Sequence, residues 1–206
     1  MNLTFISDTH NKHGHIPKEF LLGGDIIFHT GDISSRGYIH EVENFLKWYN
    51  SLDSYKYKIL IAGNHDFLFE DSPQKAKSIL ENYPNVIYLQ DSGIEIQGLN
   101  IWGSPWQPEF YNWAFNRPRK GAELLEKWKM IPRNCDILLT HGPPKGILDK
   151  VPDGFLCGCE ILYDEIIQHI NPKAHAFGHI HCGYGIQEHE GTRFINASSL
   201  NEEYKY

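Results

Sequence analysis

The chain has 206 residues, 41% hydrophobic and 22% charged, which is typical of a globular fold, and we expect a single domain spanning residues 1–206. The net charge of -7 argues against a long nucleic-acid duplex as a stable partner, because binding the phosphate backbone requires a surface of Lys and Arg. No apolar run reaches the roughly 18 residues of a membrane span, and the first residues show no secretory pattern. The four cysteines show no paired C-x-x-C spacing, so we expect a cytoplasmic protein with reduced thiols. The sequence leaves the oligomeric state open.

Apolar runs alternate with stretches of helical periodicity along the first half of the chain, and short antiparallel pieces follow later. In chain order we expect strands or helices over 3–7 (strand), 25–29 (strand), 38–50 (helix), 57–62 (strand), 72–82 (helix), 86–89, 93–96 and 99–102 (strands), 121–130 (helix), 136–140 (strand), 160–170 (helix), 174–177 (strand) and 183–195 (two antiparallel strands). This order favours an α/β sandwich of mixed sheets over one doubly wound sheet.

Five of the predicted strands end in a loop that carries Asp, Asn or His. The most unusual loop is Gly63-Asn64-His65-Asp66, which follows the apolar run 58–62. The other loops carry Asp8 with His10, Asp32, His141, and His179 with His181. Each loop alone would be an ordinary solvated turn. Because ligands of open α/β folds bind outside the carboxyl ends of the strands, the five together predict one site.

The side chains at these strand ends are those that bind divalent metals. Asp, Asn and His supply oxygen and nitrogen donors, which suit Mn²⁺, Fe or Zn²⁺ without distinguishing among them. The set is too large for one ion, so it indicates two ions about 3.5–4 Å apart that share a bridging carboxylate. We expect Asp32 to be the bridge because it stands alone on its loop. Residues i and i+2 of an extended loop point the same way, so Asp8/His10 and His179/His181 should each act as a pair.

Such a centre favours an anionic substrate. Two divalent ions, two Asp and one hydroxide leave a local charge of about +1 in an otherwise acidic protein, which suits a phosphate ester. His65, held by Asp66, is then expected to be a catalytic imidazole that protonates the leaving oxygen without binding metal.

These motifs resemble the five-motif pattern of the calcineurin-like metallophosphoesterases over nearly the whole chain. The matching pieces are Asp8-x-His10, Gly31-Asp32, Gly63-Asn64-His65-Asp66, His141-Gly142 and Gly178-His179-x-His181. Further pieces are similar to the small metallophosphoesterase domain-containing subfamily, namely Ser7–His10, His29–Asp32, Gly103–Trp106, Thr140–Pro144, Gly183–Gly185 and Ile195–Ser198.

The resemblance implies a four-layer α/β/β/α sandwich of two mixed sheets flanked by helices. It also implies two divalent ions, with Mn²⁺ the first choice and Fe or Zn²⁺ the alternatives. The implied ligands are Asp8, His10 and His181 for one ion, Asn64, His141 and His179 for the other, and Asp32 between them. His65 would contact the phosphate or the leaving group, and the implied activity is hydrolysis of small phosphodiesters, cyclic nucleotides in particular.

Residues 102–119 combine several aromatic rings with Arg117 and Arg119. Rings beside guanidinium groups suit a stacked base and a phosphate, although the same composition suits an aromatic cap or a dimer contact. We assign Asn112 and Arg117 to substrate binding, together with Asn64 and His65. A phosphomonoesterase with the same centre remains the main alternative. The acidic charge disfavours a single-strand nuclease, and the complete ligand set disfavours a non-catalytic scaffold.

Overall fold

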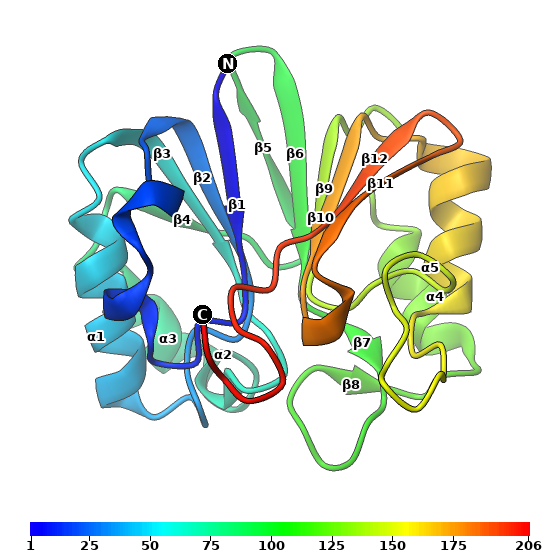
Figure 1. The fold of residues 1–206 in the computed structure, drawn as a ribbon, viewed down its shortest axis with the longest axis horizontal. Coiled ribbons are helices and arrows are strands. Elements are labelled where there is room, and N and C mark those ends of the chain that lie inside the picture. Colours follow the sequence, from blue (N-terminus) through cyan, green and yellow to red (C-terminus); the bar gives the residue numbers. More distant parts are fainter.

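The computed structural model describes residues 1–206 as two β-sheets packed face to face (Figure 1). The first sheet has the order β1-β2-β3-β4, and its strands are β1 (Leu3–Ile6), β2 (Gly24–Thr30), β3 (Tyr55–Ile61) and β4 (Val86–Tyr88). The second sheet has the order β11-β12-β10-β9-β6-β5, and its strands are β5 (Ser92–Ile96), β6 (Leu99–Ser104), β9 (Ile137–Thr140), β10 (Ala174–Phe177), β11 (Gly185–His189) and β12 (Thr192–Asn196).

Helices cover the outer face of each sheet, which gives the four layers α/β/β/α (Figure 1). The first sheet is covered by α1 (Ile39–Asn50), α2 (Phe67–Asp71) and α3 (Pro73–Leu80). The second is covered by α4 (Ala122–Trp128) and α5 (Glu160–Glu165), which continues as a π-helical turn over Ile166–Ile170. Short 3₁₀ turns lie at His13–His15, Lys18–Phe20 and His181–Gly183, and a small separate ribbon pairs β7 (Gln107–Pro108) with β8 (Asn116–Arg117). No helix combines the length and apolar character that crossing a bilayer requires.

The predicted sandwich is confirmed, with one correction. We expected two mixed sheets, but the first contains only parallel pairs because every connection between its strands crosses over its outer face. The second sheet is mixed because the hairpins β5–β6 and β11–β12 add antiparallel edges to a parallel centre. Helix α2 and the β7–β8 ribbon were not predicted, because they are too short to show periodicity.

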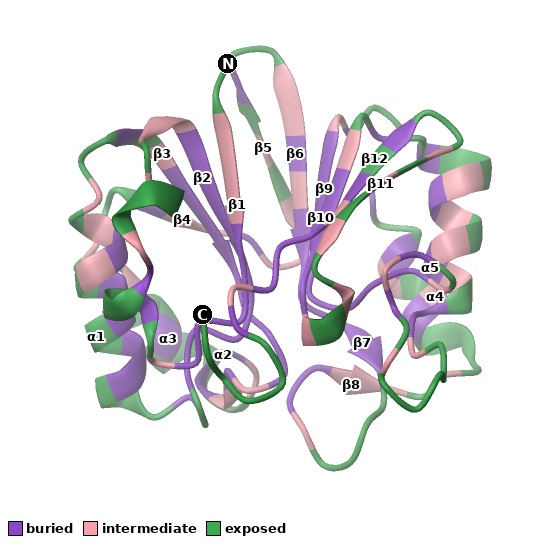
Figure 2. Cartoon of the chain, in the orientation of Figure 1, coloured by how far each residue is buried: buried purple, intermediate pink, exposed green.

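Two apolar layers hold the sandwich together. Ile26 and Phe28 of β2 point between the sheets, where they belong to the same cluster as Leu139 of β9. The intervening Ile27 points outward and packs in the cluster that contains Phe45 of α1. Burial on both faces explains why these strands read as continuous apolar runs (Figure 2). Each buried Phe or Ile contributes about 1.5–3 kcal/mol to stability, so the strands form a rigid support for the loops at their ends.

The two sheets meet at the carboxyl ends of their central strands, in the lower half of Figure 1. A parallel bridge between Ser7, after β1, and Ser198, after β12, joins them there. The loops after β1, β2, β3, β9 and β10 therefore open at one end of the molecule, as the sequence predicted.

Candidate metal centre

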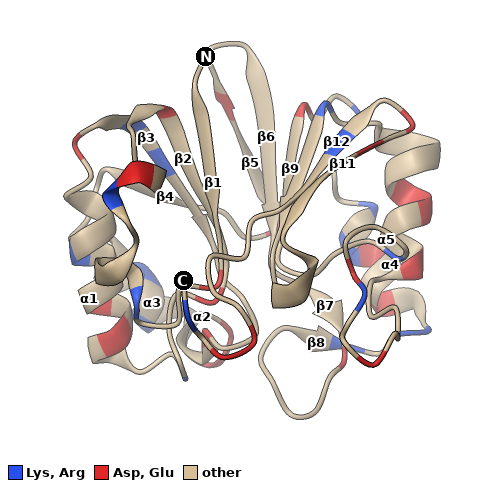
Figure 3. Cartoon of the chain, in the orientation of Figure 1, with Lys and Arg blue, Asp and Glu red and all other residues tan.

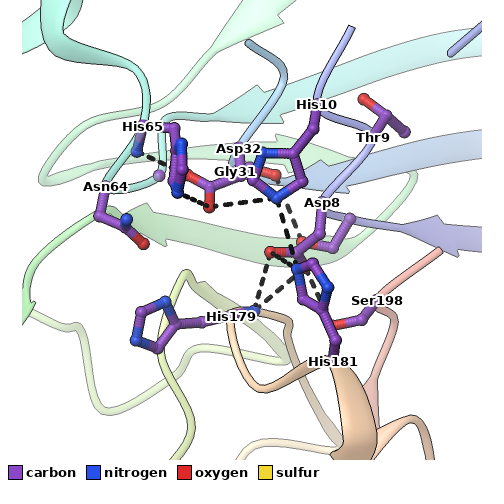
Figure 4. A network of polar contacts seen from close by, with 12 residues as sticks. Asp8, Thr9, His10, Gly31, Asp32, Asn64, His65, His179, His181 and Ser198 are labelled. Atoms are coloured by element: carbon purple, nitrogen blue, oxygen red, sulfur yellow. Dashed lines mark hydrogen bonds and ion pairs between the residues drawn. The ribbon is translucent and has the colours of Figure 1, made fainter. Parts of the chain in front are cut away.

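Three groups of side chains at this end could each hold a metal ion, and they overlap (Figure 4). Within each group, the potential ligand atoms all lie within 4.8 Å of one another. The groups are Asp8/His10/His181, His10/Asp32/His65 and Asp32/His141/His179. Six of the seven predicted ligands are among them, and they come from loops that are up to 173 residues apart in sequence (181 − 8).

Asp32 lies where the groups meet. Its Oδ2 is 3.4 Å from Nε2 of His141, 3.7 Å from Nε2 of His10 and 3.9 Å from Nε2 of His65. Its Oδ1 accepts a hydrogen bond of 2.8 Å from the backbone N–H of His65. One carboxylate thus faces both sides of the centre, which is the position a bridging ligand needs.

Asp8, His10 and His181 form one side of the centre. Nε2 of His181 lies 3.5 Å from Oδ1 of Asp8 and 3.4 Å from Nε2 of His10. The Asp8 carboxylate also accepts hydrogen bonds from the backbone N–H of His179 and from the hydroxyl of Ser198, 3.0 Å from Oδ2 in each case. A Cβ on Gly178 would overlap the Asp8 carboxylate, so this position requires glycine.

Asn64, the seventh predicted ligand, lies on the other side with His141 and His179. Its Oδ1 is 2.9 Å from Nε2 of His141, and the rings of His141 and His179 pack at 5.0 Å between centroids. The structure therefore brings all seven predicted ligands together.

Backbone carbonyls orient three of the imidazoles. Nδ1 of His141 lies 2.9 Å from the Thr30 carbonyl oxygen. The corresponding distances are 3.0 Å from Nδ1 of His181 to the Asn201 carbonyl and 2.8 Å from Nδ1 of His65 to the Ser35 carbonyl. A carbonyl only accepts, so each Nδ1 carries the proton. In the neutral ring the lone pair is then on Nε2, which faces the centre and is available to a metal.

The two buried carboxylates of the centre favour positive charge beside them. Burial alone would raise the pKa of Asp32, but His141 and His65 outweigh it and hold that pKa well below its usual range. The same balance, with His181 as the partner, lowers the pKa of Asp8. Conversely, burial would lower the pKa of His141 and His181, yet the two carboxylates raise both to about 9. Divalent ions would supply the positive charge that these protons otherwise provide, so the residues present fit a metal.

The backbone also holds the centre in place. Asp8, His10, Asp32 and His179 have positive φ angles of 53°, 38°, 56° and 67°, which side-chain-bearing residues rarely adopt. Each such conformation costs on the order of 1–3 kcal/mol, and the packed strand ends maintain it. The ligand geometry is therefore preorganised.

Asp66 does not hold the His65 ring, contrary to our expectation. Its carboxylate accepts hydrogen bonds from the backbone N–H groups of Ile33, Ser34 and Gly63 and a 2.6 Å bond from the Ser34 hydroxyl. It therefore ties the loop after β2 to the loop after β3. The side chain points into the protein, and the partner of the His65 imidazole is the Ser35 carbonyl.

His65 is covered by an aromatic ring that no sequence motif assigned to it. The Trp113 ring stacks on the His65 imidazole at 4.0 Å between centroids, and the Arg36 guanidinium lies 4.5 Å from the Trp113 ring centroid. Trp113 was visible in the aromatic stretch, but nothing in the sequence paired it with His65.

Two further predicted substrate-binding residues, Asn112 and Arg117, lie in the β7–β8 ribbon and its loop. The Arg117 guanidinium is paired with Glu70 at 3.2 Å and Glu123 at 3.5 Å and lies 3.9 Å from the Trp106 ring centroid. Asn112 is exposed in the loop between β7 and β8. Glu70 and Glu123 therefore already neutralise the Arg117 guanidinium, and the roles of Arg117 and Asn112 in substrate binding stay predictions.

The C-terminal segment also contributes to the centre, which only part of the sequence signal suggested. Ser198 was within a motif of the resemblance, whereas Asn201 and Tyr204 were not. Tyr204 packs its ring against those of His10 and His181, at 4.9 Å and 5.4 Å between centroids.

The fold and the site together define a class of protein: a four-layer α/β/β/α domain that gathers His and Asp side chains able to hold metal at the carboxyl ends of its strands. The chain belongs to the calcineurin-like phosphoesterase family, whose model matches residues 1–183.

The chain is 42% identical to human metallophosphoesterase domain-containing protein 1, with 97% of this chain and 66% of that protein aligned. It is 39% identical to UPF0046 protein T07D4.2 of Caenorhabditis elegans, covering 96% of this chain and 55% of the relative. The chain thus spans slightly less than two thirds of the human relative and about half of the worm relative. Among solved structures, TT1561 of Thermus thermophilus aligns with a TM-score of 0.67 at 15% identity, over 94% of this chain and 87% of that one, and supports the fold.

Proposed function

We propose that the centre binds two divalent ions, with Mn²⁺ the first choice and Fe or Zn²⁺ the alternatives, and hydrolyses small phosphodiesters such as cyclic nucleotides. The observation that carries this proposal is the position of Asp32, whose Oδ2 faces histidines on both sides of the centre at 3.4–3.9 Å. The seven clustered donor residues exceed the roughly four to six ligands that a single ion takes in most protein sites.

The two sides of the centre would hold one ion each. Asp8, His10 and His181 would hold the first, and Asn64, His141 and His179 the second, with Asp32 shared. When bound, the ions supply the positive charge that polarises the phosphate and lowers the pKa of water to near neutrality. The preorganised backbone and the carbonyl-anchored imidazoles keep the donors in place during the reaction.

In this proposal His65 protonates the leaving oxygen. Its Nδ1–H is committed to the Ser35 carbonyl at 2.8 Å, and its Nε2 faces the centre 3.9 Å from Oδ2 of Asp32. The imidazolium form therefore carries at Nε2 the proton that an alkoxide leaving group needs. In this proposal Asp66 acts only through the loop that carries His65.

The surface favours a small substrate. Lys and Arg positions are dispersed over several strands, loops and helices (Figure 3), and the 26 Asp and Glu residues outnumber the 19 Lys and Arg. This argues against a nuclease that follows a phosphate backbone. A small-molecule partner and a cytoplasmic location belong to the same proposal.

The test compares bis-p-nitrophenyl phosphate with p-nitrophenyl phosphate on protein stripped of metal and reloaded with Mn²⁺. A higher kcat/KM for the diester, dependent on Mn²⁺, supports a phosphodiesterase. Preference for the monoester would transfer the same residues to a phosphomonoesterase. Turnover that survives removal of all metal would refute the role of the centre.

A further inference from the structure

A pocket of about 320 Å³ opens directly beside the metal centre. His179 and His181 line it on the side of the centre, Phe110 from the β7–β8 loop lines another part of it, and Tyr204 from the C-terminal segment a third. We propose that this pocket holds the nucleoside of the substrate while the phosphate lies on the metals. This inference rests on the proposed phosphodiesterase function and assigns specificity to Phe110 and Tyr204.

The two aromatic residues have surface available for a planar group. Phe110 is 53% exposed and Tyr204 is 40% exposed, although both line the pocket. Each meets a metal-ligand imidazole edge-on, with Phe110 at 6.4 Å from His179 and Tyr204 at 5.4 Å from His181 between centroids. A base that contacts these rings therefore lies within reach of the phosphate site.

Trp113 does not offer the same surface. The His65 ring covers it by stacking, and the Arg36 guanidinium lies 4.5 Å from its centroid. Among the aromatic residues near the centre, the structure thus leaves base stacking to the pocket rather than to Trp113.

The charge around the pocket selects a neutral substituent. Its only Lys or Arg is Arg119, whose guanidinium donates to the carbonyls of Cys157 at 2.8 Å and Gly158 at 2.7 Å and pairs with Glu160 at 3.2 Å. The pocket also contains two carboxylates, Glu109 and Glu202. It therefore has no uncommitted cation for a second phosphate, whereas its acceptors suit the hydroxyl and amine donors of a nucleoside.

The C-terminal wall is anchored to the body of the protein. The Lys12 ammonium donates a hydrogen bond of 2.6 Å to the Tyr204 carbonyl, and the Tyr206 hydroxyl donates one of 2.7 Å to the Lys12 carbonyl. The Asn201 carbonyl, at the start of this segment, accepts from Nδ1 of His181. Tyr204 is thus held against the centre by contacts that do not use its own hydroxyl, which leaves its ring and hydroxyl available to substrate.

The test uses two esters with the same leaving group, thymidine 5′-(p-nitrophenyl phosphate) and methyl p-nitrophenyl phosphate. The measured quantity is the ratio of kcat/KM for the thymidine ester to kcat/KM for the methyl ester, and we expect this ratio to be well above one for the Mn²⁺-loaded protein. Phe110→Ala and Tyr204→Ala should each lower the ratio roughly 10-fold, the effect of losing one base–aromatic contact. Tyr204→Phe should retain most of the ratio because it keeps the ring. Phe155→Ala, which truncates an exposed Phe that lies outside the pocket lining, is the matched control and should leave the ratio unchanged.

A ratio near one in the unmodified protein, or a ratio that both alanine variants leave unchanged, overturns the pocket assignment while hydrolysis itself stands. If neither ester is hydrolysed, the proposed function fails, and calorimetry still decides on the pocket. Thymidine 5′-monophosphate should then bind the Mn²⁺-loaded protein more tightly than methyl phosphate, with the difference reduced by Tyr204→Ala. Equal affinities would overturn the assignment.

Discussion

Replacing His65 by alanine separates catalysis from metal binding at this centre. His65 belongs to a group with His10 and Asp32 that could hold an ion, yet we assign it to proton transfer. Truncation removes the stacking on Trp113 at 4.0 Å and the hydrogen bond to the Ser35 carbonyl. These two contacts together contribute about 1–3 kcal/mol, less than the usual 5–15 kcal/mol of a folded domain, so the variant should fold.

The expected loss is specific to the leaving group. Removing a general acid slows an enzyme by about 10²–10⁴-fold when the leaving oxygen needs a proton. We therefore expect His65→Ala to reduce kcat by about that factor for 3′,5′-cyclic AMP, which expels an alkoxide. The loss should be much smaller for bis-p-nitrophenyl phosphate, whose leaving phenolate is stable without a proton.

The assay combines kcat for both substrates with elemental analysis of the protein. His65→Ala should retain two ions, whereas the comparison variant His10→Ala, which removes a residue shared by two of the groups, should lose metal. Loss of an ion from His65→Ala would make His65 a ligand. An equal slowing of both substrates would refute its role as the acid.

Three further predictions concern the centre and the core. Asp32→Asn should abolish activity and reduce the bound metal from two ions to about one or fewer. The control Asp91→Asn, which alters a carboxylate that accepts a hydrogen bond from Ser104, should keep two ions. Two ions in the Asp32 variant would refute the bridging role of Asp32. Burial lowers the pKa of His175 from 6.5 to about 3. Between these two pH values only the unfolded chain binds this proton, so the free energy of unfolding decreases as the pH is lowered below 6.5. When the pH is lowered from 7.5 to 5, the free energy of unfolding of His175→Gln in urea should therefore fall by about 2 kcal/mol less than that of the unmodified protein. Equal decreases in the two proteins would contradict this prediction. Mn²⁺ at 100 times its Kd should raise the unfolding free energy by about 2.7 kcal/mol per site, and an unchanged urea midpoint would argue against a metal site.

Much of the centre could be predicted because its residues follow directly from local patterns. Asp8, Asp32, Asn64, His141 and His179 each follow an apolar run, and parallel strands deliver their carboxyl ends to one edge of a sheet. Position relative to a strand is a property of the local sequence. The candidate donors and an α/β sandwich were therefore accessible from local patterns, whereas the assignment of ligands to the two ions came from the resemblance to the metallophosphoesterases.

The orientation of Asp66 and the ion pair of Arg117 depend instead on contacts between segments far apart in the chain. Asp66 neighbours His65 in sequence, yet the loop turns its carboxylate inward to the Ser34 backbone and hydroxyl. Arg117 looked suited to phosphate, but Glu70, 47 residues away, neutralises it.

The sequence by itself determined which side chains stand at the strand ends, and with them the metal chemistry and the layered fold, because apolar periodicity and donor type are both encoded locally. Only the tertiary structure decided which nitrogen of three of the site histidines faces the centre, since that depends on carbonyls such as those of Thr30 and Asn201. It also decided that Phe110 and Tyr204 share one pocket beside the metals. Such pairings are set by how the two sheets pack, and packing brings together residues that no local pattern relates.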